Sequence, residues 1–176
     1  MKLYLKNHTE RYPVEQLQLQ LFAQEPSEFC TGPFTGDGTV SSLSRGKKYL
    51  TATAKVTYHG KTGYGSNRVL LTQADVRATR RLLQRSFYRA AIQARDQLPP
   101  WGALAGVRPT KLATAALLEG KSEQEVDKML RKEFYVTTPR RKMCIEAANQ
   151  TLAAMKNLAP RDLSVYIGIP FCPTRC

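Results

Sequence analysis

The feature that most constrains the fold is a short apolar run that leads directly into two cysteines. Residues 164–170 have the sequence S-V-Y-I-G-I-P, which is typical of a short buried strand. The sequence F-C-P-T-R-C follows, so Cys172 and Cys176 stand four positions apart in a tight loop. Two thiolates at this spacing suit one metal centre. Because such a centre needs three or four ligands, we expect the chain to be the front part of a longer protein.

The run Y-I-G-I-P-F-C-P-T-R-C resembles the entry to the barrel of radical S-adenosylmethionine (SAM) proteins. In that superfamily the first strand leads into C-x-x-x-C-x-x-C, whose three thiolates bind a [4Fe-4S] cluster and leave one iron open for SAM. The resemblance implies that Cys172 and Cys176 are the first two cluster ligands and that Tyr166 contacts SAM. The third cysteine would stand three residues beyond Cys176.

A second segment, residues 100–112, has the sequence P-W-G-A-L-A-G-V-R-P-T-K-L. It resembles the P-W-G-x-L-x-G-x-R-P-T-K-L segment of HemZ-type coproporphyrinogen dehydrogenases, which belong to the same superfamily. Related oxidases usually carry a histidine at the position of Gly168. The motif with glycine there is similar to the motif of the same HemZ-type group. The resemblance covers residues 99–176 and follows the expected order along the chain.

This resemblance implies a cytoplasmic enzyme of porphyrin and haem biosynthesis. Its substrate would be a porphyrinogen, two of whose propionate side chains would be oxidatively decarboxylated to vinyl groups. The cluster would need an electron donor. An alternative is a haem-binding or haem-transfer protein on the same scaffold, because the histidine is replaced by Gly168.

The balance of charge is strongly basic, with 27 Lys and Arg against 14 Asp and Glu and a net charge of +13. An acidic partner would account for it, such as a nucleic acid, a membrane surface or a polycarboxylate. So would an acidic remainder of a longer protein. A nucleic-acid-binding module is therefore a further alternative, but we do not expect nucleic acid as a partner. No apolar run approaches the roughly 20 residues of a membrane span, and no secretory leader is visible, so neither a membrane partner nor secretion is expected.

The pattern along the first part of the chain predicts an α+β fold, a small sheet with helices. We expect strands at residues 2–6, 48–58 and 64–71, with a hairpin turn at residues 59–63 and a helix at residues 13–23. Residues 25–46 are rich in Gly, Pro, Ser and Thr, which predicts loops with short strands around Phe29 and Val40.

A helical region follows. One helix is predicted over residues 72–98, with Thr72 as its cap, Asp75 in its first turn and an apolar stripe that begins at Val76. The same helix carries the arginines at positions 77, 80, 81, 85, 89 and 95, which either bind anions or are solvated or paired. Further helices are predicted at residues 110–119, 122–134 and 137–158. The domain division that results is 1–71 for the α+β unit, 72–160 for the helical region and 161–176 for the start of a truncated α/β barrel.

The remaining candidate residues carry less chemistry. Arg108 and Lys111 either clamp a carboxylate or hold this region on the barrel, whereas Trp101 is predicted to be a packing anchor. Cys144 is predicted to be a small buried hydrophobe. No phosphate-binding loop, nucleophile elbow or pair of carboxylates is present, so we expect no chemistry from these 176 residues by themselves.

Overall fold

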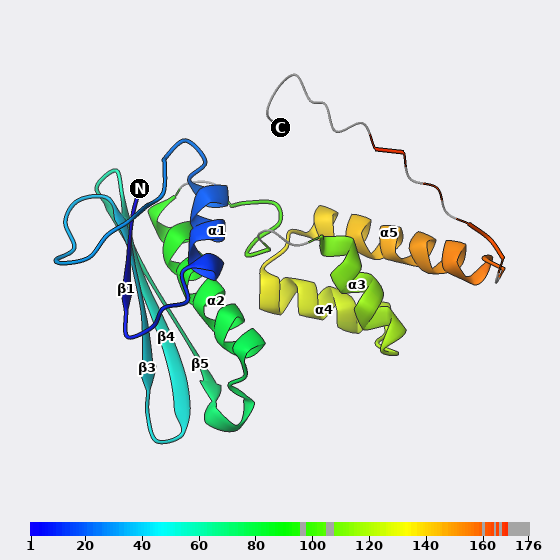
Figure 1. The fold of residues 1–176 in the computed structure, drawn as a ribbon, viewed down its shortest axis with the longest axis horizontal. Helices are drawn as coiled ribbons and strands as arrows, with labels where there is room; N and C mark the ends of the chain where they lie inside the picture. Colours follow the sequence, from blue (N-terminus) through cyan, green and yellow to red (C-terminus); the bar gives the residue numbers. More distant parts are fainter. Residues whose placement is uncertain (96–97, 105–107, 160, 164, 166, 169–176) are drawn as a thin grey trace.

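A five-stranded sheet forms one side of the molecule, and two helices pack on one of its faces (Figure 1). The computed structural model describes residues 1–95, 98–104, 108–159, 161–163, 165 and 167–168. The strand order is β2-β1-β3-β4-β5, in which β1 is parallel to both neighbours and β3 to β5 are antiparallel. The strands are β1 (Lys2–Lys6), β2 (Glu28–Phe29), β3 (Gly38–Arg45), β4 (Tyr49–Tyr58) and β5 (Lys61–Leu70).

The helices fall into two groups. Helices α1 and α2 pack against each other and lie behind the sheet, whereas α3, α4 and α5 pack together beside it (Figure 1). They are α1 (Tyr12–Leu21), α2 (Val76–Ala94), α3 (Pro109–Leu118), α4 (Glu123–Phe134) and α5 (Thr138–Lys156), with a 3₁₀ turn at Leu71–Gln73. The described chain therefore mixes a sheet with helices, as predicted.

The sheet is built by strands whose side chains alternate between the helices and the opposite face. In β4, Leu50, Ala52, Ala54 and Val56 are buried, while the residues between them are partly or fully exposed. The predicted strand at residues 48–58 is confirmed. The hairpin turn is shorter than predicted, because His59 and Gly60 alone connect β4 to β5, with φ angles of 48° and 76°.

The predicted strand around Val40 is present, but it is longer than expected, because β3 has eight residues. The buried face of this strand carries Thr39 and Ser41, which are 0% and 1% exposed. Because these buried residues are polar, the alternation of apolar and polar residues is absent from the sequence. The pairing of β3 with both β1 and β4 keeps the strand extended.

Helix α2 begins and ends inside the predicted range of residues 72–98. Asp75 is its N-cap, and the carboxylate accepts a hydrogen bond of 2.6 Å from the backbone N–H of Ala78, so the prediction that Thr72 caps the helix was wrong. The helix ends at Ala94. Val76, which we expected on the apolar stripe, is 62% exposed, because the first turn of α2 extends beyond the core.

The described chain contains two hydrophobic clusters. The first lies between the sheet and helices α1 and α2, and it includes the fully buried Leu83 and Phe87 of α2. The second lies among α3, α4 and α5. The division into residues 1–71, 72–160 and 161–176 stays a prediction, and the structure adds that α2 shares its core with the sheet.

We expect His8 to make the stability of the chain depend on pH. Burial lowers the pKa of its half-buried ring below the ordinary value of 6.5, which outweighs the opposing effects of the Ser41 carbonyl and of Glu10. The folded chain therefore takes up the proton on His8 at lower pH than the unfolded chain. The contribution of neutral His8 to the free energy of unfolding is complete above pH 6.5 and is lost as the pH falls below that value. Urea unfolding at pH 8 and at pH 5.5 measures this loss, and we expect it to be smaller in His8→Gln. An equal loss in this variant would assign the effect to other groups.

Candidate functional site

The residues of the predicted cofactor site, Tyr166, Cys172 and Cys176, lie outside the described residues. Of the predicted strand that precedes them, the structure describes residues 165, 167 and 168, and none of these three is assigned to a strand. Among the described residues, no group of three or more His, Cys, Asp or Glu side chains is placed to hold a metal ion. The metal and SAM assignments therefore stay predictions.

The described residues 100–104 of the family-like segment contact both parts of the molecule. After α2, residues 98–104 form a loop that hydrogen-bonds to the connection between α4 and α5. The N–H of Ala103 donates to the carbonyl of Phe134 over 2.7 Å, and the N–H and hydroxyl of Thr137 donate to the carbonyl of Pro100 over 3.1 and 3.0 Å. This connecting loop thus holds the end of α2 against the helical group.

Gly102 and Trp101 have separate roles in this connecting loop. Gly102 has a φ of +60°, and a Cβ there would lie 2.1 Å from the carbonyl oxygen of Phe134, so only glycine fits. Trp101 is partly buried against the second hydrophobic cluster, and the guanidinium of Arg140 lies 5.4 Å from its ring centroid. The prediction that Trp101 is a packing anchor is confirmed.

Two stacked tyrosines strengthen the same junction. The rings of Tyr88 on α2 and Tyr135 after α4 have centroids 4.8 Å apart and an interplanar angle of 17°. Burial raises the pKa of Tyr88, with a smaller contribution from Tyr135. Tyr135 adopts the left-handed conformation that ends α4, which turns its side chain toward α2. The pairing therefore depends on how α4 ends.

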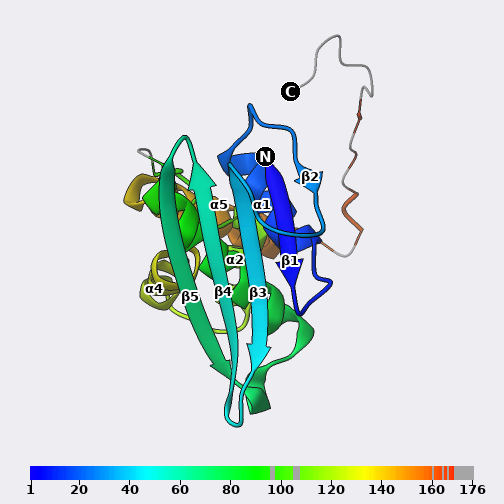
Figure 2. The ribbon, with the colours of Figure 1, turned by 90° about the vertical axis from the view of Figure 1, so that its left-hand side faces the viewer.

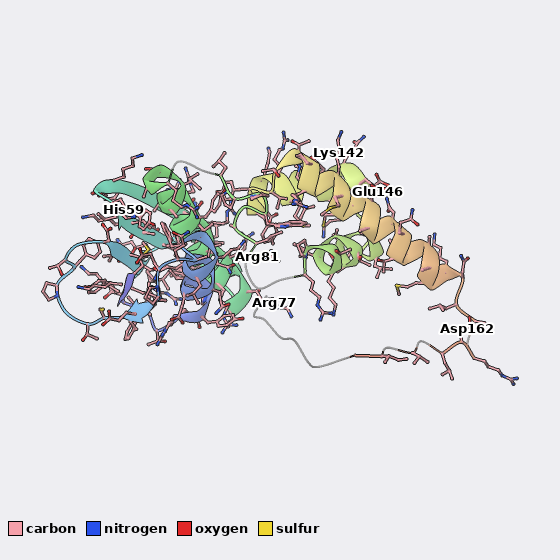
Figure 3. All side chains as sticks on the ribbon, turned by 90° about the horizontal axis from the view of Figure 1, so that it is seen from above. His59, Arg77, Arg81, Lys142, Glu146 and Asp162 are labelled. Atoms are coloured by element: carbon pink, nitrogen blue, oxygen red, sulfur yellow. The ribbon has the colours of Figure 1, made fainter. Side chains whose placement is uncertain are left out.

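The predicted arginine face of α2 is used mainly for contacts within the chain. Arg80 pairs with Glu10 at 2.8 Å, Arg81 pairs with Glu133 at 3.6 Å, and Arg89 donates to the carbonyl of Ser66. Figure 3 shows Arg77 and Arg81 on the side of α2 toward the helical group. Of the two open alternatives, pairing within the protein is favoured for Arg80 and Arg81.

A groove of about 540 Å³ lies along α3 and α4, beside Arg81. Its lining combines apolar side chains with charged ones, so it is a candidate binding site in the described part of the chain. The lining residues are Arg81, Leu112, Ala115, Ala116, Glu119, Lys121, Glu125, Lys128, Met129, Lys132 and Glu133.

The three carboxylates in this groove are engaged by neighbours. Glu133 pairs with Arg81, and Glu119 pairs with Lys121 at 2.7 Å. Glu125 accepts hydrogen bonds from the backbone N–H and the hydroxyl of Ser122, at 2.8 and 2.9 Å, in the capping box predicted for α4. The backbone hydrogen bond is the main reason that the pKa of Glu125 is lowered.

Two lysines of α4 complete the charge of the groove. In the part of the chain that the structure describes, neither Lys128 nor Lys132 forms an ion pair within 4.0 Å. They stand four residues apart on α4, so they share one side of the helix. An anionic group in the groove would meet both lysines. Sequence reasoning missed them, although their i, i+4 spacing was visible.

Arg108 and Lys111, for which clamping a carboxylate and holding this region on the barrel were both left open, lie at the start of α3, one of the helices that line the groove. Arg108 precedes α3 and Lys111 lies in its first turn, and both are exposed. Leu112, from the same family-like segment, lines the groove. The structure brings neither Arg108 nor Lys111 into the groove lining, so their role stays open between binding and attachment.

One curated protein shares clear similarity with this chain. It is a Bacillus subtilis (strain 168) protein named "Oxygen-independent coproporphyrinogen-III oxidase-like protein HemZ", and it is 38% identical over 78 residues. The resemblance to HemZ-type proteins is confirmed. The matched segment covers 43% of this chain and 16% of the HemZ protein, so the similarity concerns a small part of the relative.

The other comparisons add no relative. No family model matches the sequence, and no solved structure matches the fold. Within the described residues, none of the helices has both the length and the apolar character that a membrane crossing requires.

Proposed function

We propose that this chain is the N-terminal part of a radical SAM enzyme that converts coproporphyrinogen III to protoporphyrinogen IX without oxygen. The observation that carries the proposal is the similarity to HemZ, together with the motif that contains Cys172 and Cys176. The named relative is an oxidase-like protein, which supports a role in porphyrin and haem biosynthesis.

The residues that would hold the cofactors are those of the motif. Cys172 and Cys176 would supply two of three thiolate ligands, and Tyr166 would contact SAM. The cluster and SAM, when bound, supply the radical chemistry of the oxidative decarboxylation, and an external donor supplies the electron. The protein's own part is to position the porphyrinogen and to exclude water.

The groove between α3 and α4 suits a supporting role in this function. Porphyrinogens carry propionate groups, and the ammonium groups of Lys128 and Lys132 lack an ion-pair partner among the described residues. A propionate in the groove would pair with them. The apolar lining, which includes Leu112 and Met129, would contact the pyrrole rings.

Haem binding or transfer on the same scaffold is the second candidate. It is favoured by Gly168, which stands where related oxidases usually carry histidine. In this case the protein would bind haem without converting a porphyrinogen.

One experiment on the complete protein separates these candidates. We expect the anaerobically reconstituted protein to hold about four irons per chain, to cleave SAM and to form protoporphyrinogen from coproporphyrinogen III. A titration with haem, followed by its visible absorbance, is run on the same preparation. Stoichiometric haem binding with no turnover of coproporphyrinogen III would contradict the enzyme and support the haem protein.

A further inference from the structure

The sheet has a second face that no described helix covers. Figure 2 shows this face toward the viewer, with α1 and α2 behind the strands. The alternation of β4 places Tyr49, Thr51, Thr53, Lys55 and Thr57 on it, because the residues between them are turned toward the helices. We call this surface the open face.

Two aromatic rings lie on either side of a cation on the open face. Lys55 of β4 is the cross-strand partner of Tyr64 of β5, and Tyr64 is 62% exposed. On the other side, the ammonium of Lys55 lies 5.0 Å from the ring centroid of Phe34. The ring of Phe34 in turn packs edge-on against Tyr4 of β1, with centroids 5.5 Å apart. Tyr4, Lys55 and Tyr64 come from three strands, and Phe34 comes from the loop before β3, so strand pairing and the packing of this loop together bring the residues to one face.

The charge of the open face is positive. Register pairing places Lys2 and Lys6 of β1 and Arg68 of β5 on the same face as Lys55. The guanidinium of Arg68 lies 4.6 Å from the ring centroid of Tyr49. Among the five described strands, Glu28 of the two-residue edge strand β2 is the sole acidic residue.

We propose that the open face binds single-stranded nucleic acid. Bases stack on exposed aromatic rings whatever their identity, and cations between the rings attract the phosphates that join successive bases. The arrangement of Phe34, Lys55 and Tyr64 follows this order of ring, cation and ring. A duplex is a poorer fit, because its bases are stacked inside and its major groove admits a helix or a two-stranded ribbon rather than a five-stranded sheet.

This inference goes beyond the proposed enzyme and does not depend on it. The +13 charge alone was insufficient reason to expect a nucleic acid. The structure adds that four of the cations share one sheet face with the exposed ring of Tyr64, the partly buried ring of Phe34 and the hydroxyls of Thr51, Thr53 and Thr57.

The test measures binding of the 176-residue chain to fluorescent 12-residue oligonucleotides by anisotropy, with uridine RNA, thymidine DNA and a duplex as separate arms. We expect the single strands to bind more tightly than the duplex. The logarithm of their binding constant should fall with the logarithm of the salt concentration with a slope (the salt slope) of about 3, for four neutralised phosphates. Better binding of the RNA would indicate contacts to the 2′-hydroxyl, and equal binding would indicate recognition of the shared backbone and bases.

Five variants, three at tyrosines and two at lysines, separate the open face from general attraction by a basic protein. Tyr64→Ala should weaken single-strand binding about tenfold and Tyr64→Phe should leave it unchanged, since stacking requires the ring. Tyr12→Ala is the control, because Tyr12 is equally exposed (64%) but lies on α1. Lys55→Glu should weaken binding about tenfold and lower the salt slope, compared with Lys142→Glu on the outer side of α5 (Figure 3).

Three results would overturn the proposal: no binding at 50 mM salt, tighter binding of the duplex, or equal losses in the Tyr64→Ala and Tyr12→Ala variants. Thermal unfolding of each variant confirms that the chain is folded. Since the porphyrin reaction is not measured, failure of this test leaves the proposed enzyme standing, and failure of the enzyme leaves this test intact.

Discussion

Replacing Cys172 or Cys176 with serine should remove the proposed iron–sulfur cluster from the complete protein. A hydroxyl is a poor replacement for a thiolate toward iron, and each cysteine would be one of three protein ligands. We expect the iron content to fall from about four per chain to below about one, and SAM cleavage to fall to background. Iron analysis and visible absorbance of anaerobically purified protein measure the first effect, and the formation of 5′-deoxyadenosine measures the second.

Cys30→Ser is the matched control for these variants. Cys30 is a free, half-exposed cysteine after β2, remote in sequence from the motif. The control should keep its iron and its ability to cleave SAM. If the Cys172→Ser variant also kept four irons, the assignment of Cys172 as a cluster ligand would be wrong.

The largest expected loss of stability follows from adding one methyl group to β5. Gly65→Ala would place a Cβ 2.0 Å from the backbone carbonyl oxygen of Ser86 and 2.9 Å from the backbone nitrogen of Ala90, both on α2. Gly63 meets the same helix, since a Cβ there would lie 2.0 Å from the carbonyl oxygen of Ala90. Because backbone atoms are in the way, α2 must move off the sheet, which we expect to cost about 3 kcal/mol.

Urea unfolding of the 176-residue chain, followed by circular dichroism, measures this effect. Gly46→Ala is the control, because the nearest atom to its added Cβ would be the Tyr49 carbonyl oxygen at 3.6 Å, an ordinary contact. The free energy of unfolding of the control should lie within about 1 kcal/mol of that of the original chain. Equal free energies of unfolding of the Gly65→Ala and Gly46→Ala variants would contradict the close contact between the α2 backbone and β5.

Elements that depend on neighbouring residues were predictable. The capping box of Ser122 and Glu125 predicted the start of α4, and the turn residues at 59–63 predicted the hairpin, although not its two-residue length, because each signal lies within a few residues. The stripe of Leu83 and Phe87 predicted the buried side of α2. The resemblance to HemZ-type proteins depended on motif residues and is confirmed by the 38% identity.

Elements that depend on distant residues were not predictable in the same way. The length of β3 comes from its two partner strands, since its buried Thr39 and Ser41 give no apolar alternation. The N-cap of α2 is Asp75 and not the predicted Thr72, because residues 71–73 form a 3₁₀ turn at the edge of the core. The groove of Lys128 and Lys132 requires α3 and α4 to lie side by side.

The amino-acid sequence by itself therefore determined the local elements, the net charge and the HemZ-type resemblance, because periodicity, capping and motifs are properties of adjacent residues. The predicted ligands Cys172 and Cys176 also come from sequence alone, and the structure does not describe them. Only the tertiary structure decided that Phe34, Lys55 and Tyr64 meet on one open face. The physical reason is that strand register, sheet order and the packing of the loop that carries Phe34 depend on contacts between residues far apart in the chain, which no local pattern encodes.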